Sequence, residues 1–325
     1  MPVTTDSVLL VGDIGGTNAR FALAEPEGHG YHNEHVLQCA GYNTPELAIR
    51  TYLESIESPM PSAICLAAAG PVREGNVDLT NNHWHIREAS LNQEFGISST
   101  CLLNDFEAIA YSLPELLPEE MITFGLHEPE NLNRDAFNVA VIGPGTGLGA
   151  AGLIKRNDAL IPVITEAGHV GFAPENALQR AVWEILRHRF GRVSDERLVS
   201  GSGLENIYIS LSEIHNLPSQ KLTASEIFKE FKTNTLAAES INLFFEILGQ
   251  VAGNFVLATG AFDGLYIAGG IVQRYPELLS NSSFRASFEN KGRHRHLLEA
   301  VPTVLINHAH PGLLGAAMVA RRLVT

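Results

Sequence analysis

An apolar run passes directly into a glycine-rich turn in Val8-Leu9-Leu10-Val11-Gly12-Asp13-Ile14-Gly15-Gly16-Thr17-Asn18. The same arrangement recurs in Val139-Ala140-Val141-Ile142-Gly143-Pro144-Gly145-Thr146-Gly147-Leu148-Gly149. Glycine has no Cβ, so successive backbone N–H groups can converge on an anion, and the threonine hydroxyl adds another donor. The sequence therefore predicts two phosphate-binding turns, each at the end of a β-strand.

Asp13 in the first turn and a third glycine pair extend this interpretation. A carboxylate beside phosphate is repulsive unless a divalent cation, or a water on that cation, lies between them. The pair Gly269-Gly270 follows the strand-like run Leu265-Tyr266-Ile267. One glycine-rich loop alone is more often plain turn geometry, but the matched set favours a site for a metal–nucleotide complex.

Two other nucleotide motifs do not fit this chain. It contains no Gly-x-x-x-x-Gly-Lys-Ser/Thr sequence, which excludes a P-loop. The residues Gly147 to Gly152 match a dinucleotide fingerprint, but that fingerprint needs a following helix. Here the residues 150–155 have strand character and end at the turn Arg156-Asn157-Asp158, so a β-hairpin that clasps phosphate fits better.

Composition and charge limit the classes of partner. The 325 residues are 45% hydrophobic and 18% charged, which is typical of a two-domain globular protein with a sizeable core. The net charge of −14 argues against nucleic acids and anionic membranes, both of which attract basic surfaces. We find no signal peptide and no apolar run near the roughly 20 residues of a membrane span. The scattered Cys39, Cys65 and Cys101 are typical of reduced core residues, so we expect a cytoplasmic protein.

Strands and helices alternate in the first part of the chain, and helical periodicity dominates after Ala177. This order favours an α/β fold built on a mixed sheet. No internal repeat beyond the two turns is evident. The expected strands include Arg20–Ala24, Val36–Cys39, Ala63–Ala67 and Thr100–Leu103, and the expected helices include Pro45–Ser55 and Pro311–Arg322.

Two polar groups are candidates for the chemistry. Asn104-Asp105 ends a strand and begins a helix, where Asp105 is either a helix N-cap or a catalytic carboxylate. Glu166, His169 and Glu196 form the second group. Carboxylate, amide and imidazole side chains suit sugar hydroxyls, because they accept hydrogen bonds from, or exchange them with, vicinal O–H groups.

Other chemistries are weaker interpretations of these residues. Glu166 and His169 could ligate a cation, but the sequence offers no third ligand. The His-x-His pairs are no stronger as metal sites: His294/His296 and His308/His310. The absence of Gly-x-Ser-x-Gly disfavours a serine hydrolase of the elbow type.

These motifs, in this order, resemble those of bacterial glucokinases. The segments that carry the resemblance run almost end to end: Leu10–Arg20, Leu103–Phe106, Gly143–Gly149, Glu166–His169, Leu198–Gly201, Ile267–Val272 and Pro311–Gly315. The resemblance implies a ribonuclease-H-like, actin-like ATPase fold, in which two α/β domains, residues 1–115 with 311–325 and residues 116–310, flank a ligand cleft. It also implies ATP-dependent phosphorylation of glucose at O6 to glucose 6-phosphate and ADP, the first step of glucose use in glycolysis.

The resemblance assigns a role to each matching residue. Asp105 corresponds to the catalytic base. The glucose ligands would be Asn81, Asn104, Asp105, Glu166, His169 and Glu196. The residues that would contact ATP are Asp13, Gly15, Gly16, Thr17, Asn18, Gly145, Thr146, Gly147, Gly269 and Gly270, with Asp13 holding Mg²⁺ through water. The family also implies a homodimer.

Two departures from related patterns accompany the resemblance. Ala167 stands where the family usually has glycine, and alanine would cost on the order of 1 kcal/mol if this position needed a positive φ. The broader repressor and sugar-kinase group shares the phosphate turns but carries a Cys/His zinc motif that this sequence lacks.

The sequence leaves two alternative functions. One is a catalytically inactive sugar sensor of the same fold, and the other is an exopolyphosphatase or acetate-kinase-like enzyme.

Overall fold

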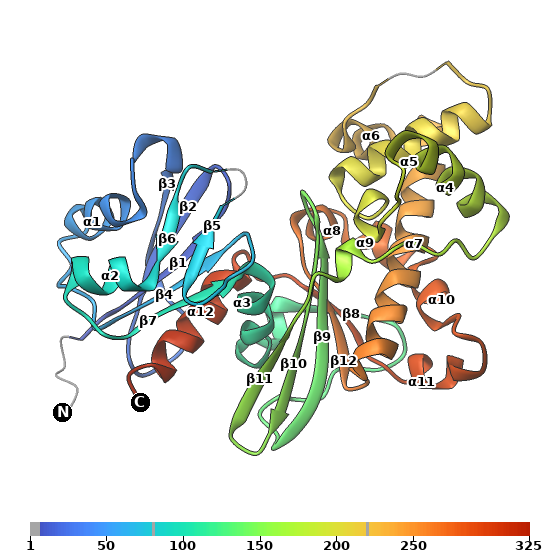
Figure 1. The fold of residues 1–325 in the computed structure, drawn as a ribbon. Helices are drawn as coiled ribbons and strands as arrows, with labels where there is room; N and C mark the ends of the chain where they lie inside the picture. Colours follow the sequence, from blue (N-terminus) through green and yellow to red (C-terminus); the bar gives the residue numbers. More distant parts are fainter. Residues whose placement is uncertain (1–6, 80–81, 219–220) are drawn as a thin grey trace. The chain divides into compact units, whose positions relative to one another are not determined.

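The computed structural model describes residues 7–79, 82–218 and 221–325. They form two compact units, which Figure 1 shows with their elements labelled. Unit 1 combines Met1–Pro118 with His308–Thr325, and unit 2 is Glu119–Asn307. The junctions expected from the sequence fall after residues 115 and 310, and those in the structure follow Pro118 and Asn307.

Unit 1 is built on a five-stranded mixed sheet in the order β3-β2-β1-β4-β7. Strands β1, β2 and β3 are antiparallel neighbours, and β1, β4 and β7 run parallel. The strands are β1 (Leu9–Ile14), β2 (Asn18–Ala24), β3 (His32–Gln38), β4 (Ala63–Ala68) and β7 (Thr100–Asn104). A small hairpin pairs β5 (Asn76–Asp78) with β6 (His85–Arg87).

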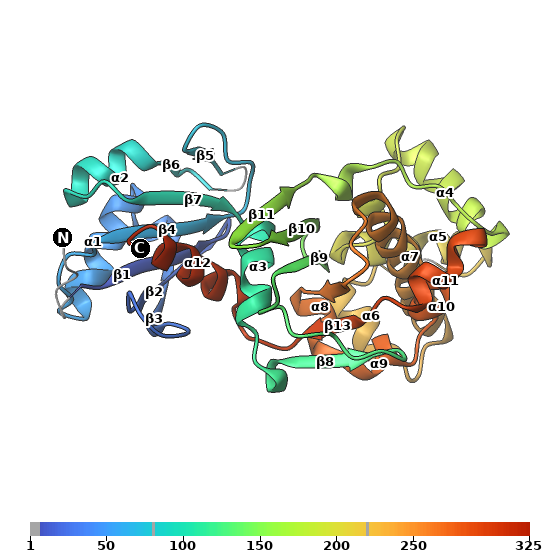
Figure 2. The same cartoon turned by 90° about the horizontal axis from the view of Figure 1, so that it is seen from below.

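Helices cover both faces of this sheet (Figures 1 and 2). They are α1 (Pro45–Ser55), α2 (Glu88–Phe95), α3 (Asp105–Ser112) and α12 (Pro311–Arg322). Leu10 and Ile14 of β1 belong to the core under α1 and α2, and Leu9 and Val11 belong to the core under α3 and α12. Because side chains alternate along a strand, a continuous apolar run serves both cores.

Unit 2 repeats this topology in a six-stranded sheet, β11-β10-β9-β12-β13-β8. The neighbours β9, β10 and β11 are antiparallel, β9, β12 and β13 run parallel, and β8 adds an antiparallel edge. The strands are β8 (Met121–Phe124), β9 (Ala136–Pro144), β10 (Leu148–Arg156), β11 (Ala159–Ile164), β12 (Gly264–Ile267) and β13 (Thr303–Ile306). The two phosphate turns therefore occupy equivalent hairpins, and the expectation of no repeat beyond the turns is wrong. The duplication lies in strand order and direction, which sequence similarity does not display.

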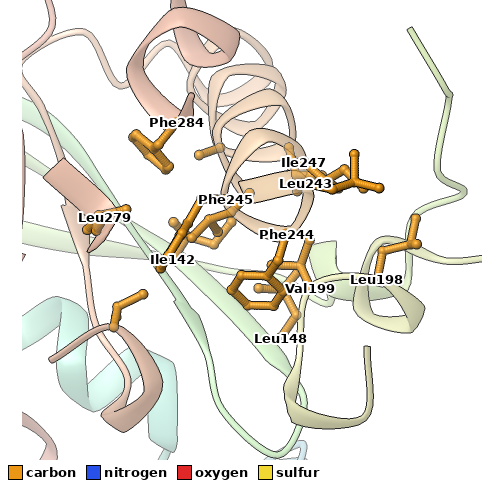
Figure 3. Packing of buried hydrophobic residues seen from close by; sticks show 14 of the residues in the cluster. Ile142, Leu148, Leu198, Val199, Leu243, Phe244, Phe245, Ile247, Leu279 and Phe284 are labelled. Carbon is orange, nitrogen blue, oxygen red and sulfur yellow. The ribbon is translucent and has the colours of Figure 1, made fainter. Parts of the chain in front are cut away.

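The core of unit 2 lies between its sheet and the long helix α7. Figure 3 shows Phe244 and Phe245 of this helix packed with Ile142 of β9 and Leu148 of β10. The helices of the unit are α4 (Ala177–Phe190), α5 (Gly201–Ile214), α6 (Ala224–Glu230), α7 (Thr235–Thr259), α8 (Gly270–Arg274), α9 (Pro276–Ser280), α10 (Phe284–Glu289) and α11 (Arg295–Glu299).

Helix α7 corrects one expectation from the sequence. In the described ranges it is the one helix that is long and apolar enough to cross a membrane, so the expectation that no apolar run reaches such a length is wrong here. Within unit 2, 72% of its most apolar window is buried. Burial of this kind is what a core helix of a large α/β unit shows.

The element boundaries follow the local signals where those are strong. The helices predicted at Pro45–Ser55 and Pro311–Arg322 are confirmed at both ends, and each begins with proline, whose fixed φ suits the first helical turn. Strand β3 covers His32–Gln38, so it starts earlier than the predicted Val36–Cys39. Its first residues are exposed and polar, which removes the apolar alternation that marks a strand. Cys39 instead begins a short 3₁₀ turn.

Candidate functional site

The first phosphate turn joins β1 to β2 in unit 1. It closes with a hydrogen bond from the Gly15 N–H to the Asn18 carbonyl oxygen (2.9 Å). Gly16, Thr17 and Asn18 are exposed, so this part of the turn is accessible to a ligand. Gln38 Nε2 donates to Asn18 Oδ1 (3.0 Å) and orients that side-chain amide.

Asp13 lies near the end of β1, against the first turn of α12. Its side chain keeps 31% of its exposed area and faces Arg20 Nη1 at 4.0 Å. A Cβ on Gly312 would come within 3.3 Å of Asp13 Oδ2, and a negative charge is favourable at such a helix N-terminus. Partial removal from water raises the pKa of Asp13, the Arg20 charge opposes this, and Glu34 adds to it.

The donor set around Asp13 fits magnesium better than a transition metal. Among the described residues, no three His, Cys, Asp or Glu side chains lie close enough together to hold a metal ion. Mg²⁺ keeps several waters in proteins and is bound through one or two carboxylates and substrate phosphates. A single, partly exposed carboxylate beside a phosphate turn is therefore compatible with a water-mediated Mg²⁺ contact.

The second phosphate turn joins β9 to β10 in unit 2, and two other segments meet it. The Gly201 N–H, at the start of α5, donates to the Gly145 carbonyl oxygen (2.9 Å). Gly269 has a φ of +105°, and a Cβ there would lie 2.5 Å from the Pro144 carbonyl oxygen. Only glycine satisfies both conditions, so the Gly269-Gly270 pair meets this turn as closely as the backbones allow.

A cavity of about 370 Å³ adjoins the second turn within unit 2. The rings of Phe228 and Tyr275 stack in its wall, with 4.4 Å between centroids and 8° between planes. Arg274 is the one charged side chain of the lining. The lining consists of Gly145, Thr146, Gly201, Ala224, Ser225, Phe228, Gly270, Ile271, Arg274 and Tyr275.

Sequence reasoning identified Gly145, Thr146 and Gly270 of this cavity but missed Gly201 and the helical wall. Phe228 comes from α6, and Arg274 and Tyr275 come from the end of α8. No motif marks these residues, and an aromatic residue in a helix is usually read as core. The spacing of Ser225 and Phe228, three residues apart, is the one signal that places both on the same helix face.

Asn104 and Asp105 lie at the junction of β7 and α3 in unit 1. Asn104 is the N-cap of α3, since its Oδ1 accepts the N–H groups of Phe106 (2.9 Å) and Glu107 (3.3 Å). Its Nδ2 also donates to the Gly70 carbonyl oxygen (3.1 Å). The interpretation of Asp105 as the N-cap is therefore wrong: Asp105 is the first residue inside the helix, and its Oδ1 accepts the Phe106 N–H (3.0 Å).

Glu166, His169 and Glu196 lie together in unit 2, although the last is separated from the others by α4. His169 Nε2 lies 3.9 Å from Glu166 Oε2, and His169 Nδ1 lies 4.0 Å from Glu196 Oε1. The side chains of Glu166, His169 and Glu196 are 68%, 59% and 31% exposed, so the group is open to a ligand. The other Glu196 oxygen, Oε2, accepts the N–H of Leu148 (3.0 Å), which directly follows the second phosphate turn.

The loop around Ala167 is not strained by the alanine. Ala167 is absent from the described non-glycine residues with positive φ, so the cost considered from the sequence does not arise. The position that requires glycine is the next one, because a Cβ on Gly168 would collide with the Leu148 carbonyl oxygen. Alanine at position 167 therefore adds no backbone strain to this loop.

Asn81, predicted to contact glucose, lies outside the described residues. Its described neighbour Asn82 donates from Nδ2 to the Gly15 carbonyl oxygen (3.5 Å), a long contact with the first phosphate turn.

Asp195 is a buried carboxylate that sequence reasoning did not single out. It is 9% exposed and precedes Glu196 in the short 3₁₀ turn 195–197. Burial raises its pKa to about 7, and the nearby Arg192 charge opposes the rise. Arg192 Nη2 also donates to the His169 carbonyl oxygen (2.7 Å), which links the loops that carry His169 and Glu196.

Known proteins resemble this chain over nearly its whole length. A family model described as Glucokinase matches residues 10–323. The glucokinase of Hahella chejuensis is 39% identical over 310 residues, which cover 95% of this chain and 95% of that protein.

Solved structures support the same relationship. A glucokinase from an Antarctic psychrotroph has a TM-score of 0.89 and 32% identity, covering 98% of this chain and 100% of that one. A ROK family glucokinase from Streptomyces griseus, solved with glucose and AMPPNP, has a TM-score of 0.64 over 97% of this chain and 100% of that one. At 19% identity the second likeness shows the fold alone. Together with the duplicated α/β sheets, these structures confirm the expected ribonuclease-H-like, actin-like ATPase fold.

Proposed function

The chain belongs to the glucokinase family, and we propose that it transfers the γ-phosphoryl group of ATP to O6 of glucose, giving glucose 6-phosphate and ADP. This reaction would be the first step of glucose use in glycolysis. The observation that carries the proposal is the position of Glu166, His169 and Glu196: the three polar side chains lie together, and one of them, Glu196, accepts the backbone N–H that directly follows the second glycine-rich turn.

The three side chains are suited to binding the hydroxyl groups of a sugar. His169 stands between two carboxylates, at 3.9 Å from one and 4.0 Å from the other, so donors and acceptors alternate around it. A hexose presents hydroxyls that both donate and accept, and a ring placed here would exchange hydrogen bonds with each side chain. We assign Glu166, His169 and Glu196 to the glucose hydroxyls, with Asn81 and Asn104 as further ligands.

The cavity beside the second turn is suited to the nucleoside of ATP. Its volume of about 370 Å³ is within the range of small-molecule pockets. The Phe228 and Tyr275 rings offer apolar surface to a base, and Arg274 offers a donor to a ribose or phosphate oxygen. Gly145 and Thr146 at its edge would direct the phosphates along the turn. We propose that the first turn, Gly15–Asn18, also contacts phosphate.

Asp13 would hold Mg²⁺ through water. When bound, Mg²⁺ neutralises charge that develops on the transferring phosphoryl group. Arg20 lies 4.0 Å from the carboxylate and would fix its orientation.

Asp105 would orient the O6 hydroxyl and accept its proton as the phosphoryl group is transferred. The proton would leave late, because the transition state of phosphoryl transfer is loose. Asp105 belongs to unit 1, and Glu166, His169 and Glu196 belong to unit 2. We also propose, from the family alone, a cytoplasmic homodimer.

A coupled ADP-release assay tests the function. ADP should appear when glucose, ATP and Mg²⁺ are present, and should stay at the background rate without glucose. Calorimetric binding of glucose with no ADP release would instead identify a sugar sensor. Release of ADP with acetate, or of orthophosphate from polyphosphate, would identify the other alternative class.

A further inference from the structure

Glu196 joins two parts of unit 2 that belong to different ligands. Its Oε1 lies 4.0 Å from His169 Nδ1, on the side assigned to the sugar. Its Oε2 accepts the Leu148 N–H at 3.0 Å, on the side of the second phosphate turn. The two oxygens of one carboxylate therefore face His169 and the end of the second phosphate turn.

The contact with the turn is closely fitted. A Cβ on Gly147 would collide with Glu196 Oε2, so glycine at this position lets the carboxylate reach the backbone. The carbonyl oxygen of Leu148 is in turn covered by Gly168, where a Cβ would also collide. Two loops therefore contact Leu148. The loop of His169 packs against its C=O through Gly168, and the loop of Glu196 accepts its N–H.

Leu148 is anchored on its third side by the core. Its side chain is 6% exposed and packs in the cluster that contains Val199 and Phe244 (Figure 3). Glu196 itself is held near the turn, because Ser200 Oγ donates to the Glu196 carbonyl oxygen (2.8 Å). The Leu148 end of the Glu196–Leu148 hydrogen bond is therefore held by packed structure.

We propose that Glu196 is a positioning residue for the phosphates of the nucleotide, in addition to its assignment as a sugar ligand. The carboxylate binds one N–H at the end of the turn and so fixes the direction of the remaining N–H groups before ATP arrives. A charge-assisted hydrogen bond is about twice as strong as a neutral one, which makes a carboxylate better suited to this task than an amide. This inference rests on the proposed function, and it predicts that Glu196 contributes to nucleotide affinity even when no sugar is bound.

Titration calorimetry of ADP with Mg²⁺, in the absence of sugar, tests the positioning role. Glu196→Met keeps the approximate size of the side chain but accepts no hydrogen bond at the Leu148 N–H, so the dissociation constant for ADP should rise roughly fivefold or more. Glu196→Gln retains an amide oxygen that can accept this N–H, so it should recover part of the loss. Glu166→Met is the matched control, because Glu166 faces His169 from the other side, whereas the described hydrogen bond to the end of the turn comes from Glu196.

The outcomes separate the inference from the function on which it rests. Weaker ADP binding in Glu196→Met, partial recovery in Glu196→Gln and wild-type ADP binding in Glu166→Met would support the positioning role. If Glu196→Met binds ADP as tightly as wild type, or more tightly because a carboxylate that repels phosphate has been removed, the inference is overturned. If wild type itself binds neither ADP nor glucose, the proposed function fails. Thermal melts of each variant identify any loss that comes from unfolding. If Glu196→Met unfolds in the assay, Glu196→Gln carries the test by itself, and wild-type ADP binding in that variant would overturn the inference.

Discussion

Asn104 and Glu107 hold the start of α3 reciprocally: Asn104 Oδ1 accepts the Glu107 N–H (3.3 Å), and Glu107 Oε2 accepts the Asn104 N–H (3.2 Å). This capping box satisfies two backbone donors that a helix N-terminus otherwise leaves unpaired. Asp105 between them is therefore not needed as a cap. Its carboxylate is in the first turn of the helix, where a negative charge is stabilised.

Asp105→Asn should separate catalysis from stability. The amide keeps the shape of the side chain but cannot take the O6 proton, so kcat should fall by about 10² to 10⁴. The dissociation constant for glucose should change far less, and so should the melting temperature, because Asn104 still caps the helix. Steady-state kinetics beside calorimetric glucose titration measures both quantities. Near-normal turnover would remove Asp105 from the catalytic role.

Gly315→Ala should destabilise unit 1. A Cβ at this position would collide with the Ala108 carbonyl oxygen, where α12 crosses α3. Overpacking of this kind costs about 1 to 3 kcal/mol, and more when backbone must move. Gly41→Ala is the control, because its Cβ would meet nothing within 4 Å. A differential melt should show a lower transition for Gly315→Ala alone; equal melting temperatures would mean that the helices separate at little cost.

The fold was predictable where local pattern and topology agree. The apolar runs before each glycine-rich turn predict β1 and β9, and prolines at 45 and 311 mark two helix starts. The duplication of the sheet was not predictable in the same way, because two units can share strand order while differing in side chains. Strand β3 was only partly predicted, since its residues are mostly exposed and lack the alternation of apolar and polar residues that marks a strand.

The candidate site, like the fold, was predictable where its residues are close in sequence and not where it depends on contacts between distant segments. Glu166 and His169 are neighbours in sequence, and their residue types alone indicate a polar site. The hydrogen bond between Glu196 and Leu148 joins residues 48 positions apart, with α4 between them in the sequence, so no local pattern reports it. The aromatic wall at Phe228 and Tyr275 likewise depends on α6 meeting α8, and no local signal reports such a meeting.

Arg274→Met should weaken the use of ATP without affecting the sugar. If the cavity holds the nucleoside, removing its one charged side chain should raise the KM for ATP by roughly tenfold, as loss of a charge-assisted contact of 1.5–3 kcal/mol predicts. The KM for glucose should stay near its wild-type value. Arg180→Met, on an exposed position of α4, controls for the loss of one positive charge. Equal KM values for ATP in the two variants would place the nucleoside elsewhere.

Glucose should be preferred over galactose. An epimer leaves at least one of the polar side chains at Glu166, His169 and Glu196 without its partner, and an unpaired polar group costs about 1 to 3 kcal/mol. The ratio of kcat/KM values should therefore be at least roughly tenfold in favour of glucose. The ADP-release assay measures it directly. Equal values for the two sugars would contradict the assignment of these residues to separate hydroxyls.

Asp195 should make the stability of unit 2 fall as the pH rises. Its pKa is raised by burial from an ordinary value of 3.8 to about 7, so between these values the folded chain binds a proton that the unfolded chain has released. The contribution is fully present below pH 4 and is lost as the pH passes through about 7. Each pKa unit corresponds to about 1.4 kcal/mol, which limits the total to roughly 4 kcal/mol.

Asp195→Asn cannot ionise, so its stability relative to wild type should increase across this window and level off above it. Chemical denaturation at a series of pH values measures the difference. The exposed carboxylate of Glu27, changed to Gln, controls for the loss of one negative charge without burial. Parallel pH profiles for wild type and Asp195→Asn would show that folding does not raise the pKa of this carboxylate.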